Sequence, residues 1–457
     1  MKKTVVINVV GLTKRLIGAY TPTIKRFLES GALSVIEPVL PAVTCAAQAT
    51  YLTGKSPDEH GIVGNGWYFK EECEVKFWRQ SNKLIKADKI WDKLKKEHPD
   101  FTCANLFWWY NMYANTDFNV TPRPNYLADG RKIPDCYSKP SELRDLLQSK
   151  LGTFPLFNFW GPKTSIKSSQ WIADASIITD ELYNPTLTLI YLPHLDYNLQ
   201  RHGLDFDKIK KDLVEIDKVV EDLLNHYQQQ DCNIVLLSEY GITNVNRPIH
   251  VNRVLREQGL LAIREERGLE LLDAGASAAF AVADHQICHV YLNDVTVKSQ
   301  VKTLLEGTPG VDSVLTGKAL EDYHLAHERC GDLVAIADKD SWFTYYFWLD
   351  DAKAPDYARM VDIHKKPGYD PVEMLIDPKD KLAMPKIIWK LLKKRMGFRT
   401  VMDVIPLQAE LVKGSHGRVP ENKADYPVLI SNKNDLLPKE TIKATEVFTI
   451  LEAHINK

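Results

Sequence analysis

Short runs of apolar residues alternate along the chain with segments whose apolar positions have helical spacing. Runs rich in β-branched residues or leucine, each bounded by polar or glycine residues, predict buried strands at 4–10, 102–107, 187–192, 233–238 and 333–337. Apolar residues at alternating spacings of four and three predict an amphipathic helix over 207–227. Strands that alternate with helices in this way indicate a mostly parallel sheet covered by helices on both faces. We therefore predict an α/β fold, a three-layer α/β/α sandwich.

The pattern changes between residues 251 and 325, where the segments become shorter. A strand is predicted at 287–292, a helix at 297–305, and a turn at Pro309-Gly310. This region predicts a small α+β insertion, so that the main domain comprises residues 1–250 and 326–457. The aromatic stretch 342–348 is typical of a buried segment rather than a pocket lining.

Lysines interleave with apolar residues over 386–396, which predicts a basic amphipathic helix. A solvated helix face is the simpler interpretation of this pattern. Binding to a membrane surface is the alternative.

Composition narrows the class of protein. Hydrophobic residues make up 44% of the 457 positions and charged residues 26%, as in ordinary globular domains. A formal net charge of -2 gives no bulk attraction to a nucleic-acid polymer. Seven cysteines without a C-x-x-C pair argue against a disulfide framework. No apolar run approaches the roughly 20 residues of a membrane span, and the first one lacks the features of a signal peptide. We expect a cytoplasmic protein.

Polar side chains stand at or just after the ends of three predicted strands: Asn8, Asp196 and Glu239. Ligands of open α/β sheets bind beyond the carboxyl ends of the strands. Thr44 precedes a small apolar segment, and on this local pattern alone it would be a helix N-cap. Capping and catalysis are compatible at a helix start, so the local pattern leaves both roles open.

Several motifs along the chain together resemble the alkaline phosphatase superfamily, and within it the nucleotide pyrophosphatase/phosphodiesterase (type I phosphodiesterase) branch. The motifs lie, in the family's order, at 40–54, 60–65, 191–203, 238–242 and 414–417. Thr44 keeps the family's spacing of ten residues to Gly54. The resemblance implies that Thr44 is the nucleophile, that it forms a phosphothreonine intermediate, and that divalent cations stabilise the charge on the phosphoryl group.

The resemblance also implies where the metal ligands lie. The family's ligand positions, other than the nucleophile, fall on Asn8, Asp196, Gln200, Glu239, Tyr240 and His416. Asp196 and His416 match the family, and Glu239 replaces one carboxylate with another. Amides and a phenol at the remaining positions are poor ligands. We therefore expect a divalent metal, zinc, held by Asp196, His416 and Glu239, as one or two ions, with the substitutions counting against the second.

Further side chains could complete the site: His194, His202, His250, Asp284 and His285. The first two flank Asp196, the third follows the turn at Glu239, and the last two end an apolar segment of the predicted insertion. A nearby histidine is more often a surface or hydrogen-bonded residue than a ligand, so these residues are additional candidates.

The reaction that the resemblance implies is hydrolysis of a phosphodiester or pyrophosphate bond in a small phosphorylated molecule. The neutral residues Asn8, Gln200 and Tyr240 favour one alternative, a catalytically decayed binding protein on the same fold. A second alternative is a phosphoryl-transfer enzyme of a biosynthetic pathway, because the same motifs serve transfer and hydrolysis.

Overall fold

The computed structural model describes residues 1–398, 400–437 and 440–457. Within these residues, nine strands form one sheet in the order β23-β2-β22-β11-β1-β10-β5-β6-β9. Their bounds are Lys3–Val9 (β1), Ala32–Glu37 (β2), Cys103–Leu106 (β5), Phe118–Pro122 (β6), Cys136–Lys139 (β9), Leu187–Leu192 (β10), Cys232–Leu237 (β11), Val428–Ser431 (β22) and Thr441–Lys443 (β23). The central strands β11, β1, β10, β5 and β6 run parallel, whereas β22 and β9 are antiparallel to their neighbours.

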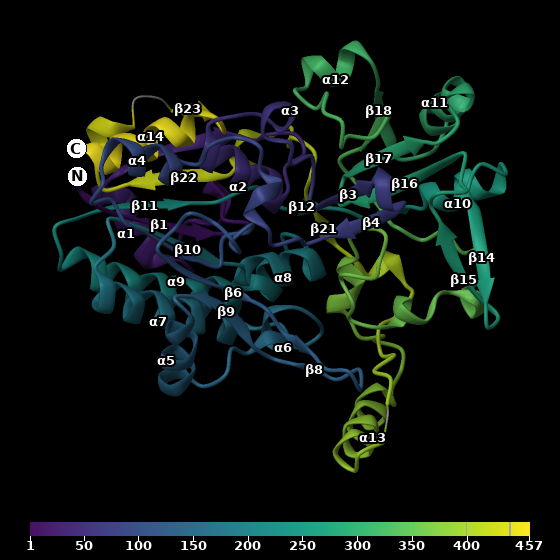
Figure 1. Cartoon of the computed structure of the whole chain (residues 1–457), viewed down its shortest axis with the longest axis horizontal. Helices are drawn as coiled ribbons and strands as arrows, with labels where there is room; N and C mark the ends of the chain where they lie inside the picture. Colours follow the sequence, from purple (N-terminus) through teal and green to yellow (C-terminus); the bar gives the residue numbers. More distant parts are fainter. Residues whose placement is uncertain (399, 438–439) are drawn as a thin grey trace.

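Helices cover both faces of this sheet (Figure 1). One face carries α2 (Thr44–Thr53), α4 (Ile90–Glu97) and α14 (Glu446–Asn456), and the other carries α1 (Pro22–Ser30), α5 (Ser141–Leu151), α7 (Ile166–Tyr183), α8 (His194–His202) and α9 (Phe206–Gln228). Strands β10 and β11 are fully buried and β1 is buried from Thr4 onward, as strands covered on both faces should be. The predicted three-layer α/β/α sandwich is confirmed.

A second, four-stranded sheet has the order β16-β17-β19-β18 and is antiparallel throughout. It comprises β16 (Ala279–Asp284), β17 (Ile287–Leu292), β18 (Val311–Leu315) and β19 (Leu333–Ala337), with helices α10 (Val251–Glu257), α11 (Lys298–Glu306) and α12 (Lys318–Asp322). The strand predicted at 333–337 is therefore real but belongs to this sheet, not to the parallel one. A fully buried run of five residues has the same pattern in either setting. Because β19 follows residue 325, this sheet reaches past the predicted insertion boundary, and the division into domains stays a prediction.

Short ribbons complete the fold. They pair β3 (Gly66–Phe69) with β4 (Glu74–Phe77), β7 (Asn125–Tyr126) with β8 (Lys132–Ile133), β12 (Thr243–Asn244) with β21 (Gly414–Ser415), β13 (Arg247–Ile249) with β20 (Ser341–Phe343), and β14 (Ala262–Glu266) with β15 (Leu269–Asp273). The aromatic stretch that includes β20 is buried in the core of the second sheet, as predicted.

Three of the described α-helices are not part of these layers. Helices α3 (Pro57–His60) and α6 (Leu156–Phe159) are single turns, and α13 (Ala383–Arg395) projects from the body of the molecule (Figure 1). Helix α13 contains most of the predicted basic amphipathic segment. Across the described residues, no helix combines the length and the apolar character needed to cross a bilayer.

Candidate active site

Thr44 is the first residue of α2, at the carboxyl edge of the main sheet. Helix α2 starts after Val43, whose backbone is extended, and it ends at Gly54, whose φ of 66° suits glycine. Val43 occupies the N-cap position, so the Thr44 hydroxyl is not the cap that its local sequence suggested. The hydroxyl instead lies 3.2 Å from the phenol oxygen of Tyr240. The positive end of the α2 dipole favours an anion beside this oxygen.

Tyr240 connects Thr44 to a carboxylate. Its hydroxyl donates to Oδ1 of Asp196 at 3.2 Å, and its ring stacks on His416 with the ring centroids 3.5 Å apart. Burial, with the neighbouring carboxylate of Asp196, raises the pKa of Tyr240 well above its ordinary value. The phenol therefore keeps its proton at neutral pH and can act as a donor, but not as an anionic metal ligand.

Glu239, the next carboxylate, is held by side-chain amides. Asn8 donates to its Oε1 at 2.6 Å, and Gln48, one turn after Thr44 on α2, donates to the same oxygen. Oε2 of Glu239 and Oδ1 of Asn8 are buried and have no hydrogen-bond partner among the described residues. Burial raises the pKa of Glu239 to about 8.

Asp196 receives two hydrogen bonds from positions where the family has metal ligands. Gln200 donates through Nε2 to Oδ2 of Asp196 at 2.7 Å, and the Tyr240 hydroxyl donates to Oδ1. Tyr369 in turn donates to Oε1 of Gln200 at 3.1 Å. Burial raises the pKa of Asp196 to about 7. Neutral donors thus occupy directions from which a cation would otherwise approach this carboxylate.

His416 has the surroundings of a metal-binding histidine. Its Nδ1 is 2.7 Å from the carbonyl oxygen of Ala42, to which it donates, and burial lowers its pKa to about 3, so the ring is neutral. Its Nε2 is buried without a hydrogen bond to any described residue and lies 4.0 Å from Oδ1 of Asp196. A metal-binding imidazole commonly donates its other N–H to a carbonyl group in this way.

The second sheet contributes Asp284 and His285 at the turn between β16 and β17. The His285 ring lies 3.7 Å from both the His416 and the Tyr369 rings, measured between centroids. Asp284 accepts from the backbone and side-chain amides of Asn65 at 2.7 and 3.0 Å, and Asn65 accepts from the Cys45 amide on α2. These two candidates therefore reach the residues around Thr44. We call Thr44, Asp196, Glu239, Tyr240 and His416 the Thr44 cluster.

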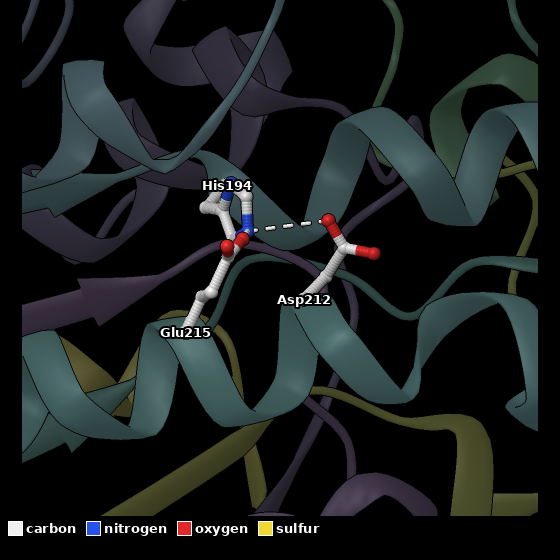
Figure 2. A group of neighbouring side chains, drawn as sticks. All are labelled: His194, Asp212 and Glu215. Carbon is white, nitrogen blue, oxygen red and sulfur yellow. Dashed lines mark ion pairs between the residues drawn. The ribbon is translucent and has the colours of Figure 1, made fainter.

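The structure does not bring three other candidates into this cluster. His194 points to α9, where it faces Asp212 and Glu215 (Figure 2). His202 lines a surface pocket together with Asn244 and Lys413. His250 lies 2.7 Å from the Thr344 hydroxyl and stacks on Tyr346.

Sequence reasoning gave no role to Gln48, Asn65 and Tyr369. Gln48 lies four residues after Thr44 and therefore on the same face of α2, a spacing that could have indicated it. Asn65 lies within the motif at 60–65 and contacts Asp284 and the Cys45 amide. Tyr369 contacts Gln200 and His285.

We expect the metal-free protein to lose stability as the pH rises from about 5 to 8. Burial raises the pKa of Asp196 and of Asp284 to about 7, and that of Glu239 to about 8. In an unfolded chain these carboxyls titrate near pH 4. The folded state then holds more protons than the unfolded state, so the free energy of unfolding falls as the pH rises through the folded pKa values.

Melting temperatures of chelator-treated protein at pH 5, 6, 7 and 8 measure this effect. Glu239→Gln removes one of the titrating groups, so its melting temperature should fall less steeply across the series. A melting temperature that stays level or rises toward pH 8 in the unsubstituted protein would contradict the expectation.

Two buried donor atoms near Thr44 have no hydrogen-bond partner among the described residues. The unpaired Nε2 of His416 beside Asp196, and the unpaired Oε2 of Glu239, are suited to a cation. The phenol of Tyr240 and the amide of Gln200 instead fill hydrogen-bonding positions on Asp196. Around Thr44, no three His, Cys, Asp or Glu ligand atoms among the described residues lie within 4.8 Å of one another.

A sequence model described as type I phosphodiesterase / nucleotide pyrophosphatase matches residues 4–370. The chain belongs to this family. Its members are hydrolases that generally depend on divalent cations.

Two curated fungal relatives of the family match about half of the chain. Ectonucleotide pyrophosphatase/phosphodiesterase 2 of Saccharomyces cerevisiae is 24% identical over 267 residues, which cover 53% of this chain and 48% of that protein. A pyrophosphatase/phosphodiesterase of Schizosaccharomyces pombe is 23% identical over 247 residues, covering 51% and 44%. The chain thus spans about half the length of the curated relatives it matches.

Solved structures show the same fold. Murine ectonucleotide pyrophosphatase/phosphodiesterase 5, in an inactive variant with AMP, superposes with a TM-score of 0.61 at 14% identity, covering 100% of this chain and 95% of that chain. Phosphonoacetate hydrolase from Sinorhizobium meliloti 1021, with phosphonoformate, gives a TM-score of 0.61 at 15% identity, covering 99% and 96%. The predicted alkaline phosphatase-like architecture is confirmed.

Proposed function

We propose that this protein hydrolyses a phosphodiester or pyrophosphate bond in a small phosphorylated molecule, with Thr44 as the nucleophile. The observation that carries the proposal is the buried line of contacts from the Thr44 hydroxyl through Tyr240 to Asp196, at the positive end of a helix. The family membership agrees with it, and so do the small ligands of the solved neighbours, the phosphomonoester AMP and the phosphonate phosphonoformate.

In the proposed reaction, Oγ1 of Thr44 attacks phosphorus in line with the leaving group. A bond forms between Oγ1 and phosphorus, and the bond to the leaving oxygen breaks. Water later attacks phosphorus, the bond between phosphorus and Oγ1 breaks, and the phosphate or phosphomonoester leaves the regenerated Thr44. As Thr44 attacks, its proton passes to the Tyr240 hydroxyl, which donates its own proton to Oδ1 of Asp196. Hydrogen bonds from Asn8 and Gln48 to Oε1 fix the orientation of the Glu239 carboxylate.

Asp196, His416 and Glu239 would hold the cation of this site. A bound divalent ion neutralises negative charge on the phosphoryl oxygens. Zinc suits a mixed set of imidazole and carboxylate ligands, so we assign zinc and a single ion.

One observation favours a second function, a binding protein that has lost turnover. Tyr240 and Gln200 satisfy Asp196 by hydrogen bonds without a cation. Such a protein would be stabilised by a phosphorylated ligand and would leave that ligand intact.

Removing the metal and adding it back distinguishes a hydrolase from a binding protein that has lost turnover. We expect slow hydrolysis of bis(p-nitrophenyl) phosphate by the purified protein, loss of this activity after chelation, and recovery with Zn²⁺. The variant His416→Ala should lack one equivalent of zinc and the activity. Turnover that is unaffected by complete metal removal would contradict the role of the cation. A melting-temperature rise with AMP but no hydrolysis of any phosphodiester in a substrate panel would favour the binding protein.

Hydrolysis and phosphoryl transfer differ in the atom that ends on phosphorus. In ¹⁸O-labelled water, hydrolysis places one label in the released phosphate or phosphomonoester. Transfer to another hydroxyl leaves the product unlabelled.

A cytoplasmic location is also part of the proposal. The seven cysteines are free thiols, and all except Cys73 are buried. Free thiols agree with a reducing compartment.

A further inference from the structure

A second group of metal-type ligands lies outside the Thr44 cluster, between α8 and α9. His194 is the first residue of α8, and Asp212 and Glu215 lie about one turn apart on α9 (Figure 2). Nε2 of His194 is 3.2 Å from Oδ1 of Asp212 and 3.3 Å from Oε2 of Glu215, and the three ligand atoms lie within 4.8 Å of one another. Only this group meets that distance condition in the described part of the chain.

The spacing of these atoms suits a tetrahedral ion. Zinc bonds of about 2.0–2.1 Å to nitrogen and oxygen, at tetrahedral angles, place neighbouring ligand atoms about 3.3 Å apart. Both measured separations have this length, whereas N–H···O hydrogen bonds are most often about 2.9 Å long. Neither ring nitrogen of His194 forms a hydrogen bond with a described residue, although the side chain is 98% buried (2% exposed) and Nε2 faces both carboxylates.

The surroundings also fit a bound ion. Asn198 donates to Oδ1 of Asp212 at 2.8 Å, which orients this carboxylate as outer hydrogen bonds orient metal ligands. The Glu215 side chain is 30% exposed, so water can reach the site and supply a fourth ligand. Lys211 pairs with the other oxygen of Glu215, Oε1, and leaves Oε2 facing His194.

We propose that His194, Asp212 and Glu215 bind one divalent transition-metal ion, with zinc as the best match. Two carboxylates balance the charge of the ion, and a neutral imidazole completes the protein ligands. The ion joins the first turn of α8 to α9. Because α8 also carries Asp196 and Gln200, the ion helps to position the residues of the Thr44 cluster without touching a substrate. This proposal does not depend on the proposed hydrolysis.

Zinc titration of chelator-treated His416→Ala protein tests the proposal, because this background lacks a ligand of the Thr44 cluster. We expect one equivalent to bind with micromolar or tighter affinity, to raise the melting temperature, and, with Co²⁺ in its place, to give the strong visible bands of a tetrahedral ion. Adding Glu215→Gln should remove all three effects.

Glu221→Gln is the matched control, because it makes the same change on an exposed part of α9. This variant should bind zinc as its parent does. The absence of zinc binding in the His416→Ala protein would overturn the proposal, and so would equal binding in the Glu215→Gln and Glu221→Gln variants. Either result would leave His194 as an ion-pair partner of the two carboxylates only.

Helix α13 projects from the body of the molecule (Figure 1). Large apolar side chains that are 43% to 62% exposed gather here, namely Leu382, Met384, Ile388, Trp389, Leu391, Leu392, Met396, Phe398 and Val401. Ile387 alone among the large apolar residues of α13 is buried. Soluble monomers rarely expose so many neighbouring apolar side chains without a partner for them.

The helix separates apolar and basic positions. At 100° per residue, the exposed apolar residues of α13 fall in one arc of about 160°, and Lys386, Lys390 and Lys393 fall in the arc beside it. Arg395 alone lies within the apolar arc, at the last position of the helix. The sequence of α13 holds five basic residues and no acidic one. A second copy of this helix would bring like charges together, whereas an anionic lipid surface offers the opposite charge.

We infer that α13 lies in the interface of an anionic membrane, with its apolar arc among the acyl chains and its lysines at the headgroups. Trp389 suits this boundary, because its ring is amphipathic. The helix would hold the protein at the surface without spanning the bilayer.

Co-sedimentation with vesicles tests this inference. The protein should pellet with phosphatidylcholine vesicles that contain 30% phosphatidylserine, and at least tenfold less with pure phosphatidylcholine. Ile388→Ser/Trp389→Ser should reduce binding at least tenfold, because it removes two buried apolar side chains from the bound state. Val295→Ser/Tyr323→Ser changes two exposed apolar residues elsewhere and should bind as the parent does.

Two results would overturn the inference. One is equal binding to both kinds of vesicle, or equal binding by both double variants. The other is a lipid-free dimer that Ile388→Ser/Trp389→Ser converts to monomer, which would make a second copy the partner of α13.

Discussion

Thr44→Ala is expected to lower kcat/KM for the best phosphodiester substrate by about 10³-fold or more. The reason is that the variant lacks the oxygen that would bond to phosphorus, while α2 and the contacts of Asp196 with Gln200 and Tyr240 remain. Thr44→Ser keeps a hydroxyl at the same place and should retain a larger part of the activity. Steady-state kinetics of the three proteins, prepared with the same zinc content, measure the effect.

Thr53→Ala is the matched control, because Thr53 lies at the other end of α2 and its hydroxyl donates to the carbonyl of Ala49. Its activity should stay within about twofold of the parent. Mass spectrometry of acid-quenched reactions should find a phosphoryl group on the peptide that contains Thr44. More than a tenth of the parent activity in Thr44→Ala, or a phosphoryl group on another residue, would reject Thr44 as the nucleophile.

Lys366→Met should destabilise the protein by about 3–5 kcal/mol. Lys366 is buried, and its ammonium lies 2.7 Å from carboxylate oxygens of both Asp370 and Glu373. Without the ammonium, two buried carboxylates remain without a cation, which costs far more than the loss of an exposed pair. Glu373 also accepts from the Trp160 indole at 2.6 Å, so the whole segment around Tyr369 depends on this cluster.

Chemical denaturation of Lys366→Met measures the loss, and Lys365→Met provides the comparison. Lys365 is exposed and pairs with Asp362 at 3.6 Å, so its replacement should change stability by less than about 0.5 kcal/mol. Equal stabilities of the two variants would show that the buried cluster contributes no more than a surface pair. Because Tyr369 touches Gln200 and His285, weaker zinc binding in Lys366→Met is expected as well.

Much of the fold could be predicted from local patterns. Strands β1, β5, β10 and β11 and helix α9 lie within two residues of their predicted ranges. Buried parallel strands are continuous apolar runs, and a long helix against a sheet needs one apolar stripe, so both patterns are unambiguous. The strand at 333–337 shows the limit, because an apolar run does not specify which sheet it joins.

The candidate site, like the fold, could be predicted only in part from the sequence. The positions of Thr44, Asp196, Glu239 and His416 follow from motifs in the sequence, and the structure places these residues around one cluster. How many cations they can hold could not be predicted, since this depends on which atoms are already paired.

The sequence by itself determined the family, the order of the central strands and of helix α9 along the chain, and the residues that replace metal ligands, because each of these depends on residue types at fixed spacings. The tertiary structure decided what those replacements do. It places Tyr240 between Thr44 and Asp196, turns Gln200 onto Asp196, and points His194 away to α9. Hydrogen bonds and ion pairs between residues far apart in sequence depend on side-chain directions that only the packed chain fixes.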